Sequence, residues 1–159
     1  MLPAVVLAAG AATRYGGPKQ REFLPRVLER LRAAGVTDVV VVSGAYDLDV
    51  DARIVRCEDW ARGPGASLRC GLAALPPTAT HALVVLADGP DLDPRAVARV
   101  VEHRHDADVV AASYASARGH PASLARAVWA TVPDAGGRAL DATLVPCDDL
   151  EPPGDIDYR

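Results

Sequence analysis

The sequence predicts a three-layer α/β fold whose central sheet is mostly parallel. Short apolar stretches, typical of strands that are covered on both faces, alternate along the chain with longer stretches of helical periodicity. Repeated alternation of strand and helix needs right-handed crossovers and gives parallel neighbours. A chain of 159 residues is long enough for one domain with a core and short for two, so residues 1–159 are predicted to form a single domain.

The first half of the chain predicts three strands and two helices. Strands are expected at Ala4–Leu7 and Val39–Val42, which are nearly continuous apolar runs, and a short one at Ile54–Val55. The apolar residues that recur at helical spacing between the first two strands are Phe23, Leu24, Val27, Leu28 and Leu31. They predict a helix that ends near Gly35. A second helix is expected at Ala66–Leu75 and is stopped by the two prolines that follow.

The second half predicts three more strands and two helices. Ala82–Leu86 reads as a buried strand, and a helix is expected to begin at Asp93, a good capping residue with a proline after it. Val109–Ala112 is predicted to be a strand, Ser123–Val132 a helix, and Thr143–Val145 a last short strand.

Charge and hydropathy exclude some partners and favour others. The net charge of -4 argues against a general nucleic-acid binder, and no apolar run is long enough to span a bilayer. The apolar stretch Leu2–Ala9 has no basic residues before it and leads into a glycine turn, so it is not expected to be a signal peptide. Positions 14–32 hold six basic residues against two acidic ones, which suits a small anionic ligand such as a nucleotide.

The three cysteines are Cys57, Cys70 and Cys147. They are odd in number, far apart and without metal-ligand spacing. We therefore expect reduced, partly buried thiols in a cytoplasmic protein, with no catalytic role.

A glycine-rich turn follows the first strand, from Ala8 to Pro18. In parallel α/β sheets ligands bind at the carboxyl ends of strands, and glycines let backbone N–H groups surround a phosphate. Arg14 and Lys19 can supply positive charge there. The turn is neither a Walker A loop nor a dinucleotide fingerprint, and a flexible surface loop is the alternative interpretation. Lys19 is the one lysine among 17 basic residues, which suggests that this position needs a compact ammonium.

Several segments together resemble a known family. Leu7-Ala8-Ala9-Gly10, followed by Arg14, Gly16-Gly17 and Lys19, resembles the signature of nucleotidyltransferases with a Rossmann-like, GT-A-like fold. The similarity is to the MobA-like NTP transferase family, and within it to the molybdenum cofactor cytidylyltransferases. Further segments follow in register: Gly63–Leu68 resembles the second nucleotide-binding segment, Leu86–Pro90 the metal-binding loop, Gly119-His120-Pro121 the family's Gly-His-Pro turn, and Asp155-Ile156-Asp157 its late Asp-Ile-Asp element.

The resemblance implies a Mg²⁺-dependent transfer of a nucleoside monophosphate from an NTP to a phosphorylated acceptor such as molybdopterin, with release of pyrophosphate. Such chemistry needs positioning and charge neutralisation. Arg14 suits the β- and γ-phosphates, and Lys19 the α-phosphate. Asp88 is expected to bind Mg²⁺ together with Asp157, with Asp155 as the alternative second ligand.

The resemblance also assigns a nucleotide-binding set. Its members are Leu7, Ala8, Ala9, Gly10, Gly16, Gly17, Gly63 and Ser67. Two interpretations of Ser67 stay open, since it either binds the nucleotide or caps the helix that follows. Asp91 is likewise open between a metal ligand and a helix cap. His120 is expected to line the acceptor pocket, against the alternative of a solvated histidine in a turn.

The resemblance also bears on which nucleobase is bound and on how far the site is enclosed. Ala9 belongs to a Leu-Ala-Ala-Gly turn, which in the family accompanies cytidylyl transfer, so CTP is expected in preference to GTP. The family's Gly-x-Pro-Leu segment is missing after Lys19, and the chain stops at Arg159, where relatives continue. We expect either an unusually open site or one that a partner or second copy completes. The alternatives are the same chemistry on a sugar phosphate or another small phosphorylated acceptor, and a shortened relative that binds without turnover.

Overall fold

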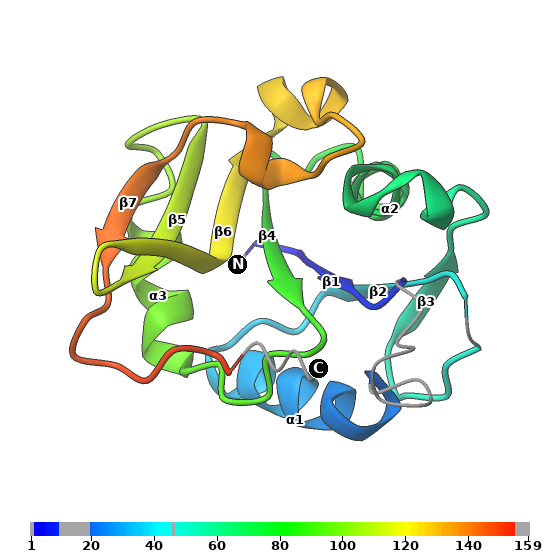
Figure 1. Ribbon diagram of the computed structural model, residues 1–159, viewed down its shortest axis with the longest axis horizontal. Coiled ribbons are helices and arrows are strands. Elements are labelled where there is room, and N and C mark those ends of the chain that lie inside the picture. Colours follow the sequence, from blue (N-terminus) through cyan, green and yellow to red (C-terminus); the bar gives the residue numbers. More distant parts are fainter. Residues whose placement is uncertain (1, 10–19, 46, 155–159) are drawn as a thin grey trace.

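The computed structural model describes residues 2–9, 20–45 and 47–154, and within them seven strands form one sheet in the order β3-β2-β1-β4-β6-β5-β7 (Figure 1). The strands are β1 (Ala4–Leu7), β2 (Val39–Ser43), β3 (Arg53–Arg56), β4 (His81–Leu86), β5 (Val109–Tyr114), β6 (Ala117–Ala125) and β7 (Thr143–Pro146). The predicted strands are therefore present, and β6 is an additional one.

Six of these seven strands run in the same direction. β1 pairs in parallel with β2 and β4, β2 with β3, and β5 with β7, whereas β6 is antiparallel to both of its neighbours, β4 and β5. The prediction of a mostly parallel sheet is confirmed. From β1 the chain builds outward to β3, and it then returns to place β4 on the other side of β1. The strand order therefore reverses between β1 and β4.

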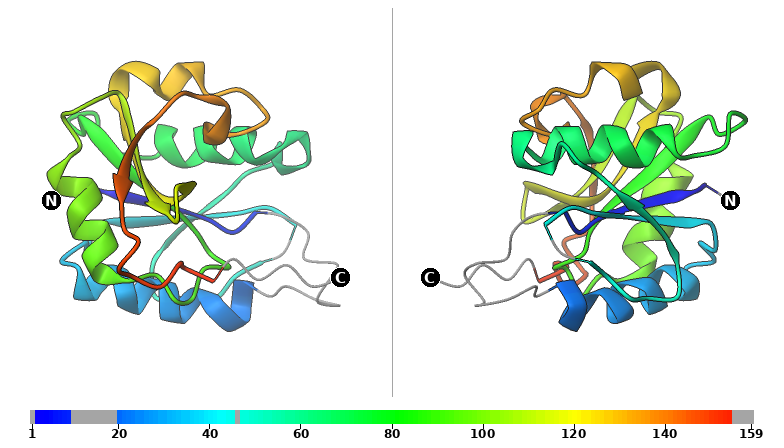
Figure 2. Two further views of the ribbon diagram at one scale, coloured as in Figure 1. Left: turned by 60° about the vertical axis from the view of Figure 1, so that its left-hand side comes forward. Right: turned by 90° about the vertical axis from the view of Figure 1, so that its right-hand side faces the viewer.

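Helices cover both faces of the sheet and give the predicted three layers (Figures 1 and 2). α1 (Gln20–Ala33) and α3 (Pro94–Glu102) lie on one face. On the other face lie α2 (Pro64–Ala73) and the 3₁₀ helices η3 (Arg126–Thr131) and η4 (Gly137–Ala139), and a further 3₁₀ helix, η2 (Trp60–Arg62), leads into α2. None of the helices in the described part of the chain has the length and apolar character that crossing a bilayer requires.

The central strands divide their side chains between two apolar cores. Val6 and Val85 pack in the core beneath α1 and α3, whereas their neighbours Val5 and Val84 pack in the core beneath α2. Because both faces of these strands are covered, every position must be apolar, which explains the continuous apolar runs in the sequence. The N-terminus of α3 is also as predicted, since the Asp93 carboxylate accepts a hydrogen bond from the Arg95 backbone N–H at 2.9 Å.

The predicted helix at Ser123–Val132 is wrong. β6 continues to Ala125, and only then does the chain form the 3₁₀ helix η3. The predicted Gly119-His120-Pro121 turn is wrong for the same reason, because these residues lie inside β6. Short apolar segments suit a strand or a helix equally well, and here the pairing of β6 with β4 on one side and β5 on the other decides the outcome.

The expectation of three reduced thiols is also wrong, because Cys57 and Cys70 form a disulfide. Cys57 directly follows β3, and Cys70 lies on α2, which packs against that end of the sheet. The two Cα atoms are 5.9 Å apart, although the residues are separated by 13 positions in sequence. Cys147 is a free, buried thiol. The pairing depends on how α2 docks on the sheet, which cysteine spacing alone does not reveal.

Removing the disulfide is expected to lower the free energy of unfolding by about 3 kcal/mol, because a closed loop of this length restricts the unfolded chain. The measurement is guanidinium denaturation of the wild type and of Cys70→Ser, each with and without dithiothreitol. The reductant should destabilise the wild type to the level of the variant and leave the variant unchanged. Three free thiols on titration of the unreduced, denatured wild type would contradict the bond.

Candidate active site

The carboxyl ends of β1 and β4 form the edge at which the predicted site residues meet. Leu7 and Leu86 are register partners at the ends of these strands, and the Ala87 N–H donates to the Leu7 carbonyl at 3.0 Å. Ala8 follows Leu7 directly after β1, and Asp88 lies two residues after Leu86 at the end of β4. The strand order reverses between β1 and β4, and open α/β sheets bind ligands at the carboxyl ends of the strands where such a reversal occurs.

Asp88 lies in the turn after β4, and this turn packs against the His120 ring. Asp88 is half-buried, and His120 is buried on the neighbouring strand β6. A Cβ at Gly89 would lie 2.7 Å from the Cε1 atom of His120, so the position accepts only glycine without a shift of the ring. The Leu86 N–H also approaches His120 Nδ1 at 3.5 Å, the limit of a hydrogen bond. The structure therefore brings Asp88 and His120 together.

The segment after β7 returns to the same loop. The Asp91 N–H donates to the Pro153 carbonyl at 2.8 Å, and the Asp91 carboxylate pairs with Arg26 at 3.1 Å. Both side chains of this pair are half exposed, so the pair contributes little to stability. Asp91 thus holds the chain end against the loop and does not cap α3, a role that Asp93 takes. Gly154, the last described residue, follows at this point.

The second predicted nucleotide-binding segment forms the first turn of α2. Gly63 is its N-cap with φ of 134°, a backbone conformation that favours glycine, and no side chain caps the helix. The Gly65 N–H donates to the Asp134 carbonyl at 2.9 Å, and a Cβ at Gly65 would overlap the carbonyl of Pro133. Ser67 is buried one turn inside the helix, so the capping interpretation of Ser67 is wrong.

The Asp134 side chain ties the loop between η3 and η4 to α2. Its carboxylate pairs with Arg69 of α2 and with Arg62 of η2, the latter at 3.3 Å. The hydrogen bond from Arg69 lowers the pKa of the Asp134 carboxyl, and Arg62 lowers it further. Arg69 also donates to the Val132 carbonyl at 2.6 Å. The loop therefore follows the position of the first turn of α2.

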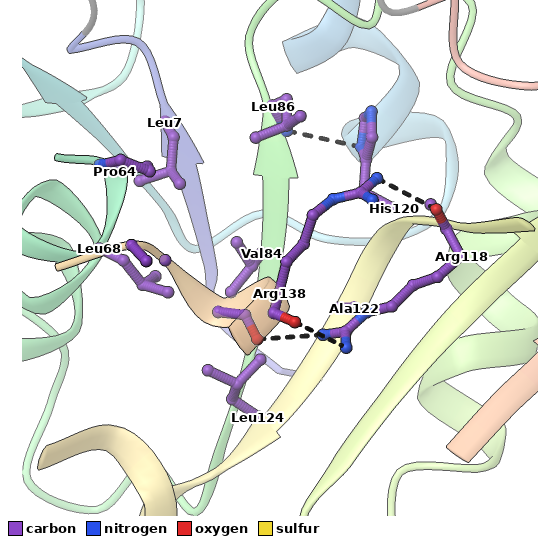
Figure 3. Close-up of a pocket in the computed structure, with 14 residues that line it drawn as sticks. Leu7, Pro64, Leu68, Val84, Leu86, Arg118, His120, Ala122, Leu124 and Arg138 are labelled. Carbon is purple, nitrogen blue, oxygen red and sulfur yellow. Dashed lines mark hydrogen bonds between the residues drawn. The ribbon is translucent and has the colours of Figure 1, made fainter. Parts of the chain in front are cut away.

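A pocket of about 240 Å³ lies between the sheet and this loop (Figure 3). Its lining residues are Leu7, Pro64, Leu68, Val84, Leu86, Arg118, Gly119, His120, Ala122, Leu124, Ala135, Gly136, Gly137 and Arg138. Leu7 and His120 thus share one cavity, and Pro64 brings in the first turn of α2. Ala8 and Ala9 do not line it, because their side chains are buried in the two cores.

The sequence did not single out the two arginines of this pocket. Arg118, at the start of β6, donates to the Leu140 carbonyl at 2.6 Å and to the Gly137 carbonyl at 3.1 Å. Arg138, in η4, donates back to the Arg118 carbonyl at 3.1 Å. Burial lowers the pKa of the Arg118 guanidinium, and the positive charge of Arg138 lowers it further. The one sequence signal is their position, Arg118 before Gly119-His120-Pro121 and Arg138 after two glycines.

Several predicted residues lie outside the described part of the chain. They are Gly10, Arg14, Gly16, Gly17, Lys19, Asp155 and Asp157. Among the residues that the structure does describe, no group of three His, Cys, Asp or Glu side chains could hold a metal ion. The metal site predicted at Asp88 and Asp157 therefore stays a prediction.

Comparison with known proteins shows which family has this arrangement of sheet and crevice. The sequence model of the MobA-like NTP transferase domain matches residues 4–145, nearly the whole chain. The chain belongs to this family. The resemblance seen in the sequence is confirmed, and the protein is a nucleotidyltransferase.

Solved structures of similar proteins have the same fold. Rv0371c from Mycobacterium tuberculosis is 27% identical, with a TM-score of 0.81 over 95% of this chain and 90% of that one. A complex of Rv0371c with manganese is 26% identical, with a TM-score of 0.78 over 99% and 93% of the two chains. Among curated proteins, the bifunctional protein GlmU of Sorangium cellulosum is 32% identical over 113 residues. That match covers 58% of this chain and spans about a quarter (24%) of GlmU.

Proposed function

We propose that this MobA-like nucleotidyltransferase transfers a cytidylyl group from CTP, with Mg²⁺, to a small phosphorylated acceptor. The observation that carries the proposal is the crevice at the reversal of strand order, where Leu7 and His120 line one pocket and the turn that holds Asp88 packs against His120. It supplies a first loop for the triphosphate, a carboxylate for a cation, and a pocket for the second substrate.

The proposed reaction is an in-line displacement at the α-phosphorus. A phosphate oxygen of the acceptor forms a bond to this phosphorus, while the bond to the oxygen that bridges to the β-phosphate breaks. That oxygen keeps the electron pair, and pyrophosphate leaves. No protein nucleophile is needed, so the chain contributes position and charge. Arg14 is assigned to the β- and γ-phosphates and Lys19 to the α-phosphate, with Gly10, Gly16 and Gly17 giving backbone N–H donors.

The residues at Asp88 fit a divalent cation. Asp88 carries carboxylate oxygens, the donors that Mg²⁺ prefers, and lies half-buried in the turn directly after β4. Asp157 comes three residues after Gly154, which follows the contact of Pro153 with Asp91, and three residues span at most about 10 Å. Both carboxylates are therefore assigned to the cation, and the manganese complex of Rv0371c supports a cation in such a fold. When bound, Mg²⁺ neutralises phosphate charge and aligns the two reacting groups.

CTP is proposed in preference to GTP because of Ala9. Its methyl group lies on the α2 side of the sheet, packed with Val42 and Leu68 in that core. The Gly63–Ser67 segment lies on the same side. A filled position beneath the base leaves less room for a purine than a glycine would, and one methyl group discriminates by about 1–3 kcal/mol.

Ala9→Gly is expected to reduce the preference for CTP over GTP by about tenfold, because it removes that methyl group. Calorimetric titration of both variants with CTP and with GTP, in the presence of Mg²⁺, measures the preference. A loss of affinity for both nucleotides in equal proportion would mean that the substitution only loosens the turn. Wild-type protein that binds GTP as tightly as CTP would reject the proposed base.

The acceptor is proposed to be a molybdopterin-like phosphate, with a sugar phosphate as the alternative within the same chemistry. Pyrophosphate release, measured for each NTP with a panel of phosphorylated acceptors, tests the whole proposal. CTP with one acceptor class should give release far above hydrolysis without acceptor. Because nucleoside triphosphates are made and used in the cytoplasm, that compartment is proposed for the reaction.

A further inference from the structure

We propose that Arg118 and Arg138 bind the acceptor's phosphate group, and that the pocket beside them selects an acceptor with a flat, apolar body over a polyhydroxylated sugar. This inference rests on the proposed function and specifies the second substrate of the same site. It assigns a binding role to two residues on different elements, β6 and η4, that lie 20 positions apart in sequence.

The charges of Arg118 and Arg138 favour an anion. Within the described residues, neither Arg118 nor Arg138 takes part in an ion pair, whereas other arginines nearby, such as Arg69, are paired with an aspartate. In the described part of the chain both guanidinium groups donate to backbone carbonyls, and burial, followed by the positive charge of Arg138, lowers the pKa of Arg118. Two positive charges that lie close together attract an anion, and the Asp141 carboxylate offsets part of the charge at Arg118.

The arrangement of the Arg118 and Arg138 side chains also leaves hydrogen-bond donors for a phosphate. The two side chains run side by side in opposite directions, so that each guanidinium donates to the backbone near the base of the other (Figure 3). Arg138 donates through one nitrogen, Nη2, and a guanidinium carries five N–H donors in a planar fork. Donors therefore remain for a phosphate, which arginine binds through two parallel hydrogen bonds.

The pocket beside the two arginines is lined mainly by apolar side chains. Its floor and walls are apolar, made by Leu7, Leu68, Val84, Leu86 and Leu124. The polar side chains that line it are those of Arg118, His120 and Arg138, all toward one end. A sugar would bury several hydroxyl groups against leucine and valine without hydrogen-bond partners, at a cost for each. A flat or apolar body with a terminal phosphate matches the walls and the arginines together.

The position of Arg138 is also fixed relative to the nucleotide. The loop that precedes it is tied to α2 by the Asp134 carboxylate and by the Gly65 N–H. An anion held by Arg138 would therefore keep a set distance from the first turn of α2, which the proposed function assigns to CTP.

The test measures binding directly, by NMR titration with phenyl phosphate, glucose 1-phosphate and inorganic phosphate. Phenyl phosphate should bind most tightly, and Arg138→Gln should weaken it by about tenfold, the effect of losing a charged hydrogen bond. Arg138→Lys, which keeps the charge without the fork, should recover part of the loss. The control is Arg126→Gln, since Arg126 also donates to backbone carbonyls but lies at the other end of β6, and its affinity should match the wild type.

Separate titration with CTP and Mg²⁺ distinguishes failure of the anion site from failure of the proposed function. Phenyl phosphate that binds through Arg138 in a protein that does not bind CTP would overturn the proposed function and leave the anion site standing. If Arg138→Gln bound phenyl phosphate as tightly as the wild type, the anion site would be overturned. If the wild type bound glucose 1-phosphate as tightly as phenyl phosphate, the selectivity would be overturned. Both conclusions hold whatever the result with CTP. Thermal unfolding of each variant confirms that the fold is intact.

Discussion

Asp88→Asn is expected to lower the rate of pyrophosphate release by about a thousandfold or more, with little change in the free energy of unfolding. A carboxylate that holds a cation against the phosphates contributes several kcal/mol to the transition state, and each 1.4 kcal/mol is about tenfold in rate. The side chain lies in the turn beyond β4, half-buried and outside both cores, so the amide should fit in the same place. Steady-state kinetics with the best NTP and acceptor pair measures the effect.

Asp91→Asn is the matched control. Asp91 is three residues away in the same loop, and its partner is Arg26 in an exposed pair. Its loss should change the rate by less than about fivefold, because exposed pairs contribute at most about 1 kcal/mol. Circular dichroism and chemical denaturation show whether either variant is misfolded. If Asp88→Asn retained most of the wild-type rate at saturating Mg²⁺, the carboxylate would not be a metal ligand.

Gly65→Ala is expected to destabilise the protein by about 3 kcal/mol and to weaken CTP binding at the same time. The new methyl group would overlap the carbonyl group of Pro133, and both partners are backbone, so no side chain can rotate away. The first turn of α2 must then separate from the loop on which it rests and lose the hydrogen bond to Asp134. Guanidinium denaturation gives the stability, and calorimetry gives the affinity for CTP.

Gly137→Ala is the control for that substitution. It lies in the same region, at the start of η4, but a Cβ there would make only an ordinary contact with the Leu68 side chain at 3.5 Å. Its stability should stay within about 1 kcal/mol of the wild type, since the backbone conformation suits alanine. A destabilisation equal to that of Gly65→Ala would indicate that any added bulk in this loop is costly, and would contradict the specific overlap.

The sequence predicted the fold best where one physical cause dominated. β1, β2 and β4 are buried on both faces, so their apolar runs have one explanation. The start of α3 was predicted because Asp93 and Pro94 act locally. β6 was missed because its character comes from its partners: residues 123–125, which were predicted to begin a helix, are the end of a strand that pairs with β4 and β5.

The site residues, like the fold, could be predicted only where the sequence signal is local. Leu7, Asp88 and His120 could be singled out because each stands in a motif that is continuous in sequence; Leu7 and His120 line one pocket, and Asp88 lies in the turn that packs against His120. Arg118 and Arg138 were not, because their proximity depends on the loop that Asp134 anchors to α2. The disulfide between Cys57 and Cys70 was missed for a similar reason. Long-range docking leaves no local pattern to read.

The place of β6 has a consequence for how the sheet assembles. β4 and β5 share no register, and in the described structure the β1–β4 half of the sheet is joined by hydrogen bonds to β5 and β7 only through β6. β6 also follows both of its partners in the chain. Its pairing with β5 is a tight hairpin in which Tyr114 and Ala117 are partners, whereas its pairing with β4 joins residues as distant in sequence as His81 and Ala125. The pairing with β4 therefore closes late, because the intervening chain must be ordered first, and until then the edge of β4 is open. A substitution that disrupts β3 or β7 should loosen only an edge of the sheet, whereas one that disrupts β6 should separate β5 and β7 from the rest of the sheet.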